Sequence, residues 1–98
     1  MKYKIEKLKQ AEKEINQLSR VQKKSLLDDF RLIEEKGIEF VKRRHLRDDL
    51  FEIKTNDVRS LFKYTDNSII LIGLVYEKRS KKAPENHIET ALKRLKGI

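Results

Sequence analysis

The sequence has no cysteine and no tryptophan, and it contains one proline and three glycines in 98 residues. Without cysteine it can form neither a disulfide framework nor a thiolate metal site. The longest apolar run, Ile69–Tyr76, is far too short to cross a bilayer as a helix. The first ten residues also lack the apolar core of a signal peptide. We therefore expect one folded domain over residues 1–98, located in the cytoplasm and without a membrane partner.

Positive charge is what the sequence has in excess. Lysine and arginine number 24 against 16 acidic residues, which gives a formal net charge of +8. This excess favours a polyanionic partner such as nucleic acid, the ribosome or an acidic protein. Many small domains are basic without such a partner, so charge alone does not assign a function. The apolar residues are periodic, which indicates a folded chain and not a disordered one.

Residues 50–82 contain three β-runs separated by two turn signals. The first two runs are separated only by Asn56 and Asp57, a two-residue loop that favours a hairpin. This loop sets a register in which Lys54 lies opposite Arg59. Because side chains alternate across a sheet, the pattern predicts an apolar face and a second face that carries these two cations. The apolar face is predicted to hold Phe51, Ile53, Ser60 and Phe62.

Two like charges directly opposite each other destabilise a strand pair. They are tolerated as solvated edge charges, or because an anion binds to them. The next run, Ile69–Tyr76, is continuously apolar, as is typical of a central strand. With a turn at Asp66–Asn67, we expect Leu74 opposite Arg59 and Tyr76 one step further along. Lys54, Arg59, Tyr76 and the basic segment 78–82 would then share one end of one sheet face.

The first third of the chain predicts a short strand and two helices. Residues 2–8 alternate in part, although they also fit the start of a helix. A helical pattern follows from Leu8 to Leu18. Ser19 and Gln22 then form a capping-box pattern for a second helix that ends at Gly37. Its expected buried stripe consists of Leu26, Leu27, Phe30 and Ile33. We expect an antiparallel helical hairpin that covers the apolar sheet face.

Residues 38–49 are expected to form a connector, and residues from Pro84 onward a final helix that ends at Gly97. The connector has a basic core, which suits either a solvated loop or a phosphate-contacting loop: Lys42, Arg43, Arg44, His45 and Arg47. The last helix has a 3.6-residue apolar stripe: Ile88, Ala91, Leu92 and Leu95. The predicted fold class is α+β, with a short N-terminal strand, a helical hairpin, a three-strand antiparallel meander and a C-terminal helix.

Several strings in this order resemble the RelE/HigB toxins of bacterial type II toxin–antitoxin systems, within the RelE/ParE superfamily and especially its phage-associated HigB-like branch. HLRDDLFEIK is similar to the family strand L-x-x-G-L-Y-E-L-R, with Lys54 in place of the arginine. VRSLFKY resembles Y-R-x-x-Y and supplies Arg59. LIGLVYEKRSKKAPENHIETALKR resembles the family's last strand and helix. The resemblance covers nearly the whole chain.

The resemblance implies a RelE-like fold and a ribosome-dependent mRNA endonuclease that inhibits translation and growth. It further implies that the enzyme needs no metal and no cofactor, and that a cognate antitoxin of the helix-turn-helix type neutralises it. Such enzymes drive the 2′-hydroxyl of RNA onto the adjacent phosphate. That reaction needs a base, cations for the phosphorane and an acid. The same fold serves ParE-like gyrase inhibitors, so a toxin without nuclease activity, or a plain RNA- or ribosome-binding module, stays open.

By this resemblance Arg59 would stabilise the phosphate, and Lys54 would contact the phosphate or act as the base. Lys78 and Arg79 would grip the backbone, and His87 is the candidate acid or base, although a lone surface histidine is more often incidental. The other residues expected to bind RNA phosphates are Lys42, Arg43, Arg44, Tyr76, Lys81 and Lys82.

One departure from the family pattern concerns a carboxylate, because Glu52 stands where some family members have a second strand lysine. Glu52 and the adjacent pairs Asp28–Asp29 and Asp48–Asp49 could suggest a metal nuclease. Adjacent residues do not converge on one ion, and Asp28 and Asp29 fall on a helix expected to cover the opposite sheet face, so we expect no metal site.

Overall fold

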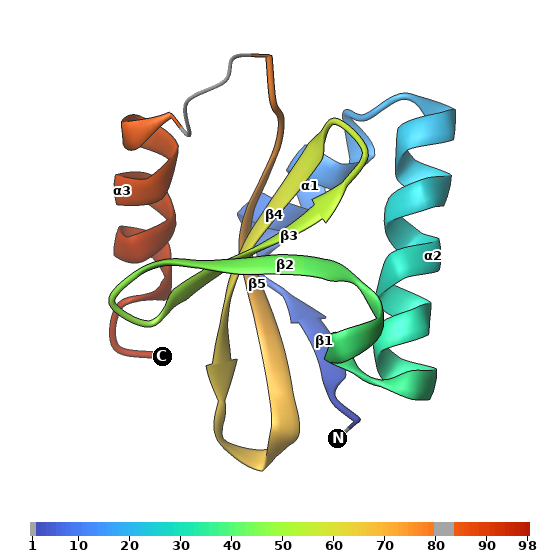
Figure 1. Ribbon diagram of the computed structural model, residues 1–98. Coiled ribbons are helices and arrows are strands. Elements are labelled where there is room, and N and C mark those ends of the chain that lie inside the picture. The colour runs from blue at the N-terminus through green and yellow to red at the C-terminus, as the bar shows by residue number, and fades with distance from the viewer. Residues whose placement is uncertain (1, 80–83) are drawn as a thin grey trace.

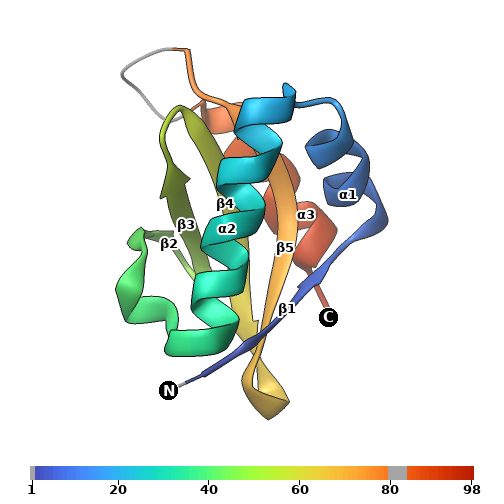
Figure 2. The same cartoon turned by 90° about the vertical axis from the view of Figure 1, so that its right-hand side faces the viewer.

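The computed structural model describes residues 2–79 and 84–98 and shows a mixed sheet between two helical layers. In chain order the elements are β1 (Lys4–Lys7), α1 (Lys9–Asn16), α2 (Arg20–Lys36), the 3-10 helix η1 (Ile38–Phe40), β2 (Lys42–Arg47), β3 (Leu50–Thr55), β4 (Val58–Thr65), the 3-10 helix η2 (Asp66–Ser68), β5 (Ile69–Glu77) and α3 (Glu85–Leu95). The five strands are ordered β1-β5-β4-β3-β2, with β1 parallel to β5 and the other pairs antiparallel. Helices α1 and α2 cover one face and α3 covers the other (Figures 1 and 2). The predicted α+β class is confirmed.

The start and end of α2 follow from its sequence. Ser19 Oγ accepts a hydrogen bond from the Gln22 amide at 3.1 Å, and Gln22 Oε1 accepts one from the Ser19 amide at 3.0 Å, which confirms the capping box. Gly37 ends the helix with a φ of 125°. Leu27, expected in the buried stripe, is instead 37 % exposed. Successive residues of a helix are rotated by about 100° about its axis. Because Leu26 is buried in the core, the next residue, Leu27, points partly toward solvent.

The basic stretch predicted as a connector is mostly a strand, so this prediction was wrong. β2 pairs with β3 and includes the basic residues Lys42, Arg43, Arg44, His45 and Arg47. The meander therefore has four strands, with β2 at the edge of the sheet. Strands are recognised in a sequence by apolar alternation. Most of the β2 side chains are exposed, so this alternation is missing from its sequence.

The predicted register of the β3–β4 hairpin is confirmed at every pair, from Thr55 opposite Val58 to Phe51 opposite Phe62. The predicted register of β4 on β5 was wrong, because Arg59 lies opposite Tyr76 and not opposite Leu74.

Two irregularities explain the difference. The turn η2 has three residues where two were expected, and a β-bulge follows between Leu61 and Phe62. Beyond the bulge the two shifts add up to an even number of positions, so Tyr76 keeps its predicted face, the one that carries Arg59.

Each sheet face has its own apolar core. On the α1–α2 side the core includes Ile15, Leu26, Ile33, Ile53, Phe62 and Ile70. On the α3 side it includes Leu50, Leu61, Leu74, Ile88 and Leu95. Helix α3 packs closely on β5 because Gly73 has no side chain. A Cβ at this position would lie 2.7 Å from Leu95 Cγ.

Charged side chains cover part of the β5 edge. The Val75 amide donates to Glu14 Oε1 at 3.0 Å, and Arg94 Nη1 donates to the Gly73 carbonyl at 3.1 Å. Arg94 also pairs with Glu14 Oε2 at 3.0 Å. These bonds satisfy backbone groups that β1, which pairs only with Ile69–Ile72, does not reach. Among the helices of the described residues, none combines the length and apolar character needed to cross a membrane.

We predict that Phe62→Ala lowers the free energy of unfolding by about 3–5 kcal/mol, because it leaves a cavity in a fully packed core. Phe62 has no exposed surface and contacts the rings of Phe51 and Tyr64. Val21→Ala is the control, since Val21 is 75 % exposed, and it should change stability by no more than about 0.5 kcal/mol. Urea denaturation of both variants tests this, and equal midpoints would contradict the assignment of the core.

Candidate functional site

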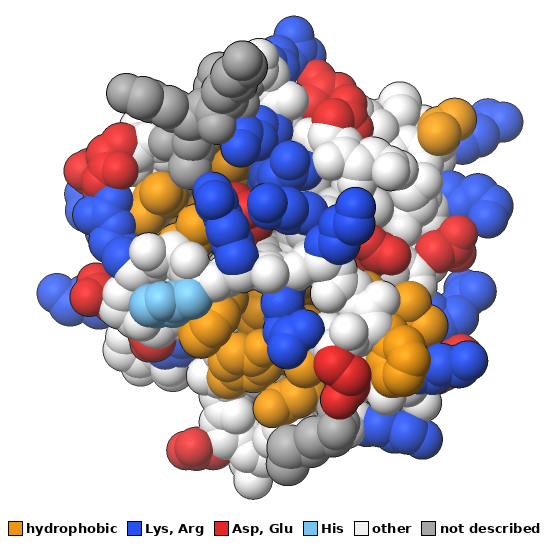
Figure 3. Space-filling model, viewed as in Figure 1, with side chains coloured by type: hydrophobic (Ala, Val, Ile, Leu, Met, Phe, Trp, Pro, Cys, Tyr) orange, Lys and Arg blue, Asp and Glu red, His pale blue; other side chains and the backbone are white. Residues whose placement is uncertain are grey.

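Four neighbouring strands align one polar side chain each. Lys42 of β2 lies opposite Lys54 of β3, Lys54 lies opposite Arg59 of β4, and Arg59 lies opposite Tyr76 of β5. Residues directly opposite on neighbouring strands share a sheet face, so these four form one line, the cross-strand row. Figure 3 shows Lys and Arg side chains gathered on this side of the molecule, between α3 and α2. The predicted grouping of Lys54, Arg59 and Tyr76 is present, and Lys42 extends it.

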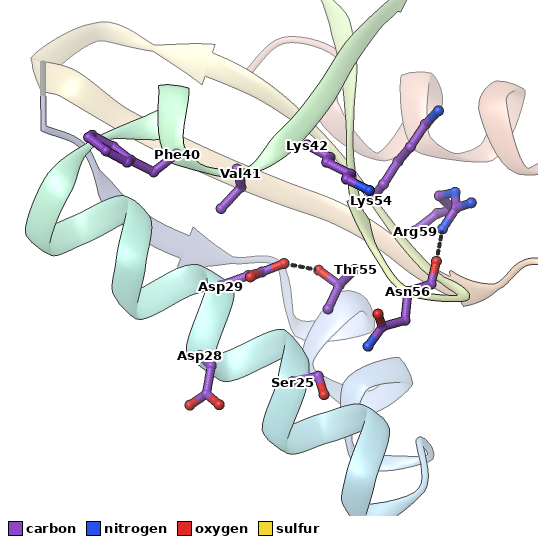
Figure 4. A pocket seen from close by; sticks show the side chains of 10 residues that line it. All are labelled: Ser25, Asp28, Asp29, Phe40, Val41, Lys42, Lys54, Thr55, Asn56 and Arg59. Atoms are coloured by element: carbon purple, nitrogen blue, oxygen red, sulfur yellow. Dashed lines mark hydrogen bonds between the residues drawn. The ribbon is translucent and has the colours of Figure 1, made fainter.

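Arg59 is held by the hairpin turn. Its Nη1 donates to the Asn56 carbonyl at 2.6 Å and to the Val58 carbonyl at 3.1 Å, and the first of these bonds is drawn in Figure 4. Asn56 adopts a φ of 55°, as tight hairpin turns require. The turn that sets the register therefore also orients the guanidinium. These bonds go to carbonyl oxygens and not to a carboxylate, so they leave the positive charge of Arg59 unneutralised.

A buried carboxylate lies beside the row. Glu52 is 0 % exposed, and its Oε1 accepts a hydrogen bond from Arg44 Nε at 3.0 Å. Its other oxygen, Oε2, and Arg59 Nε are both buried without a hydrogen-bond partner among the described residues. The predicted register places Glu52 on the same face as Lys54 and Arg59, which the structure confirms, but sequence reasoning gave Glu52 no role in the site.

Helix α3 adds His87 to the end of the row. The rings of His87 and Tyr76 are stacked with centroids 4.4 Å apart and an angle of 28° between their planes. Burial raises the pKa of Tyr76, and the negative charge of Glu52 raises it further, while Arg59 and Arg44 lower it. Its phenol is therefore protonated at neutral pH. His87 is thus not an isolated surface histidine but a neighbour of the row.

A cavity of about 530 Å³ opens beside the row (Figure 4). Lys42, Lys54 and Arg59 line its sheet side, and Ser25, Asp28 and Asp29 line its α2 side. Asp29 Oδ2 accepts a hydrogen bond from Thr55 Oγ1 at 2.6 Å, whereas Asp28 points away from the strands (Figure 4). Within the described part of the chain, no group of three or more His, Asp or Glu side chains is arranged to hold a metal ion.

Among the other predicted phosphate contacts, Arg43 lies away from the row and Arg79 is paired with a carboxylate. Arg43 lies opposite Ile53 on the α1–α2 face, and its Nη1 donates to the Ile38 carbonyl at 3.3 Å. It also faces Tyr64, whose pKa burial raises and Arg43 partly lowers. Arg79 Nη2 pairs with Glu77 Oε1 at 2.7 Å, in a cavity that Gln22 and Tyr76 also line.

The remaining predicted contacts follow β5. The Lys78 amide donates to the Asp57 carbonyl at 2.7 Å, which places Lys78 beside the hairpin turn. Lys81 and Lys82 lie outside the described residues. Among the predicted residues, the structure therefore brings Lys42, Arg44, Lys54, Arg59, Tyr76 and His87 together.

Solved structures similar to this chain share its fold. A variant of the E. coli toxin RelE in the free state is 21 % identical, with a TM-score of 0.69 over 97 % of this chain and 99 % of that chain. The archaeal RelE–RelB complex from Pyrococcus horikoshii OT3 contains a chain that is 19 % identical, with a TM-score of 0.68 over 84 % of this chain and 100 % of that chain. These likenesses establish the fold and confirm the expected resemblance to RelE.

Sequence comparison supplies the family. A search of curated proteins gives no match. The family model "Phage derived protein Gp49-like (DUF891)" matches residues 13–96, which is most of the chain and runs from within α1 to the end of α3. The chain therefore belongs to the phage-derived Gp49-like family and has the fold of the RelE toxins.

Proposed function

We propose that this protein is the toxin of a type II toxin–antitoxin system, and that it cleaves mRNA on the ribosome without a metal ion. The observation that carries this proposal is the cross-strand row with His87 at its end. Several of the similar solved structures are RelE toxins in complex with an antitoxin, which supports an antitoxin as the partner of this chain.

The row suits the cleavage of a phosphodiester. Attack of the 2′-hydroxyl on the adjacent phosphate places additional negative charge on the phosphorane oxygens. Lys54 and Arg59 are directly opposite each other, so they present two positive charges to one phosphate. Arg59 is preorganised by its bonds to the turn, and preorganised donors stabilise developing charge without reorganisation. In this proposal His87 accepts the proton of the 2′-hydroxyl.

The electrostatics of the free protein favour an anionic ligand. Lys42, Lys54 and Arg59 are consecutive along the row, and like charges at opposed positions repel. A phosphate bound between them removes this repulsion. The row places phosphate-binding cations next to two side chains that can transfer protons, the stacked Tyr76 and His87. RNA cleavage needs this combination and inhibition of gyrase does not, so the row favours the nuclease over a ParE-type gyrase inhibitor.

We predict that Arg59→Ala yields a folded protein that cleaves mRNA roughly 100- to 1000-fold more slowly, the effect of losing one preorganised donor. Its melting temperature should change little, because the substitution also relieves repulsion from Lys54. Cleavage is measured by primer extension on translating ribosomes. Arg43→Ala is the matched control, since Arg43 lies on the other sheet face. A folded Arg59→Ala variant with wild-type cleavage would remove Arg59 from the site.

We also predict that two adjacent residues differ in their effect on RNA binding. Lys42 is in the row, and Arg43 points to the other face. For a 2′-O-methylated single-stranded RNA, which cannot be cleaved, Lys42→Gln should reduce the slope of log affinity against log salt by about 0.7, the value for one lost phosphate contact. Arg43→Gln should leave the slope unchanged. Equal slopes for both variants would show that Lys42 makes no phosphate contact.

A further inference from the structure

We propose that Tyr76 is the proton donor of this site and that Glu52 is its positioning residue. This inference rests on the proposed nuclease function and deepens it, because the cations of the row stabilise the phosphorane but do not supply an acid for the leaving oxygen.

Tyr76 occupies the position that an acid would need. It lies opposite Arg59 in the row, so a phosphate held by Arg59 lies next to the phenol. It is only 8 % exposed, and its ring is fixed against His87 by stacking. A base and an acid must both reach one phosphodiester. Stacked side chains at the end of the row place the two groups side by side.

Glu52 is buried with an incomplete set of hydrogen bonds, which a purely structural role does not explain. Burying a carboxylate is costly unless it is fully paired, yet within the described part of the chain only Oε1 is bonded, to Arg44. The unpartnered Oε2 and the unpartnered Arg59 Nε belong to the same sheet face. Buried polar groups are nearly always satisfied, and an exception calls for an explanation. Here the carboxylate holds Arg44 near Tyr76 and supplies a negative charge beside the row.

The groups that face Tyr76 set its proton affinity. Burial and Glu52 raise the pKa of the phenol, and Arg59 and Arg44 lower it. His87, from α3, covers its ring. The phenol therefore keeps its proton at neutral pH, and the two guanidinium groups stabilise the phenolate once the proton has left. An alkoxide leaving group is far more basic than a phenolate, so the transfer from Tyr76 is favourable.

The chemical step balances. A bond forms between the 2′-oxygen and phosphorus, and the bond from phosphorus to the 5′-oxygen breaks. The 2′-hydroxyl proton passes to a ring nitrogen of His87, and the Tyr76 hydroxyl proton passes to the 5′-oxygen. The products are a 2′,3′-cyclic phosphate and a 5′-hydroxyl. Loss of the imidazolium proton and reprotonation of the phenolate restore the site.

A substrate whose leaving group needs no acid tests the role of Tyr76. In an mRNA with a bridging 5′-sulfur at the cleavage site, the thiolate leaves without protonation. Tyr76→Phe should cleave the normal mRNA about 100- to 10,000-fold more slowly than the wild-type protein, but should cleave the 5′-thio substrate at the wild-type rate. Arg59→Ala should be slow on both. Tyr64→Phe is the matched control, a tyrosine on the other sheet face, and should be normal on both.

The titration of Tyr76, followed first by NMR and then by activity, tests the role of Glu52. In protein labelled with ¹³C at the tyrosine ring carbons, Glu52→Gln removes a negative charge near Tyr76, so the pKa of Tyr76 should fall. The alkaline limb of the cleavage profile should move to lower pH with it. Glu89→Gln, an exposed change on α3, should alter neither measurement.

The outcomes separate the two proposals. If Tyr76→Phe is equally slow on the normal and the 5′-thio substrates, Tyr76 is not the acid, and an unchanged Tyr76 titration in Glu52→Gln would remove Glu52 from its role. Both results leave the nuclease proposal standing. If the wild-type protein cleaves neither substrate on ribosomes, the nuclease proposal itself fails.

Discussion

Repulsion between like charges is the constraint on which this structure depends. The two-residue turn at Asn56 and Asp57 allows only one register for β3 and β4, and that register puts Lys54 against Arg59. β2 adds Lys42 to the same line. The apolar cores on the two faces hold the strands together despite this repulsion. The fold thus uses hydrophobic burial to keep cations closer together than they would remain in a flexible chain.

The arginine that is neutralised by a carboxylate lies beside the row, and the arginine within the row is not neutralised. Arg44 has a buried carboxylate partner in Glu52, whereas Arg59 is held by carbonyl oxygens that orient it without cancelling its charge. The distinction matters because a guanidinium already paired with a carboxylate would bind a phosphate less strongly. Arg44 is therefore held by its ion pair as a structural residue, whereas Arg59 keeps a positive charge that is available to bind an anion.

Sequence reasoning succeeded where one local feature decides the structure and failed where several segments act together. The hairpin register follows from two turn residues, and the α2 capping box from Ser19 and Gln22. The bulge at Leu61–Phe62 has no comparable local signal, so the partner of Arg59 was misplaced.

The site was predictable to the same extent. Lys54, Arg59 and Tyr76 were grouped correctly, because alternation along predicted strands fixes their face. Because β2 was not recognised as a strand, its alternation could not be used to place Lys42 and Arg44 on one sheet face and Arg43 on the other. The pairing of Glu52 with Arg44 depends on that missed strand, so the sequence pattern did not reveal it.

Helix α3 contributes to both the sheet edge and the site. Arg94 completes the β5 edge by bonding to Gly73 and Glu14, and His87 lies on the same helix. One helix, α3, therefore completes both the sheet edge and the end of the row, so a displacement of α3 would expose the β5 backbone and at the same time separate His87 from Tyr76.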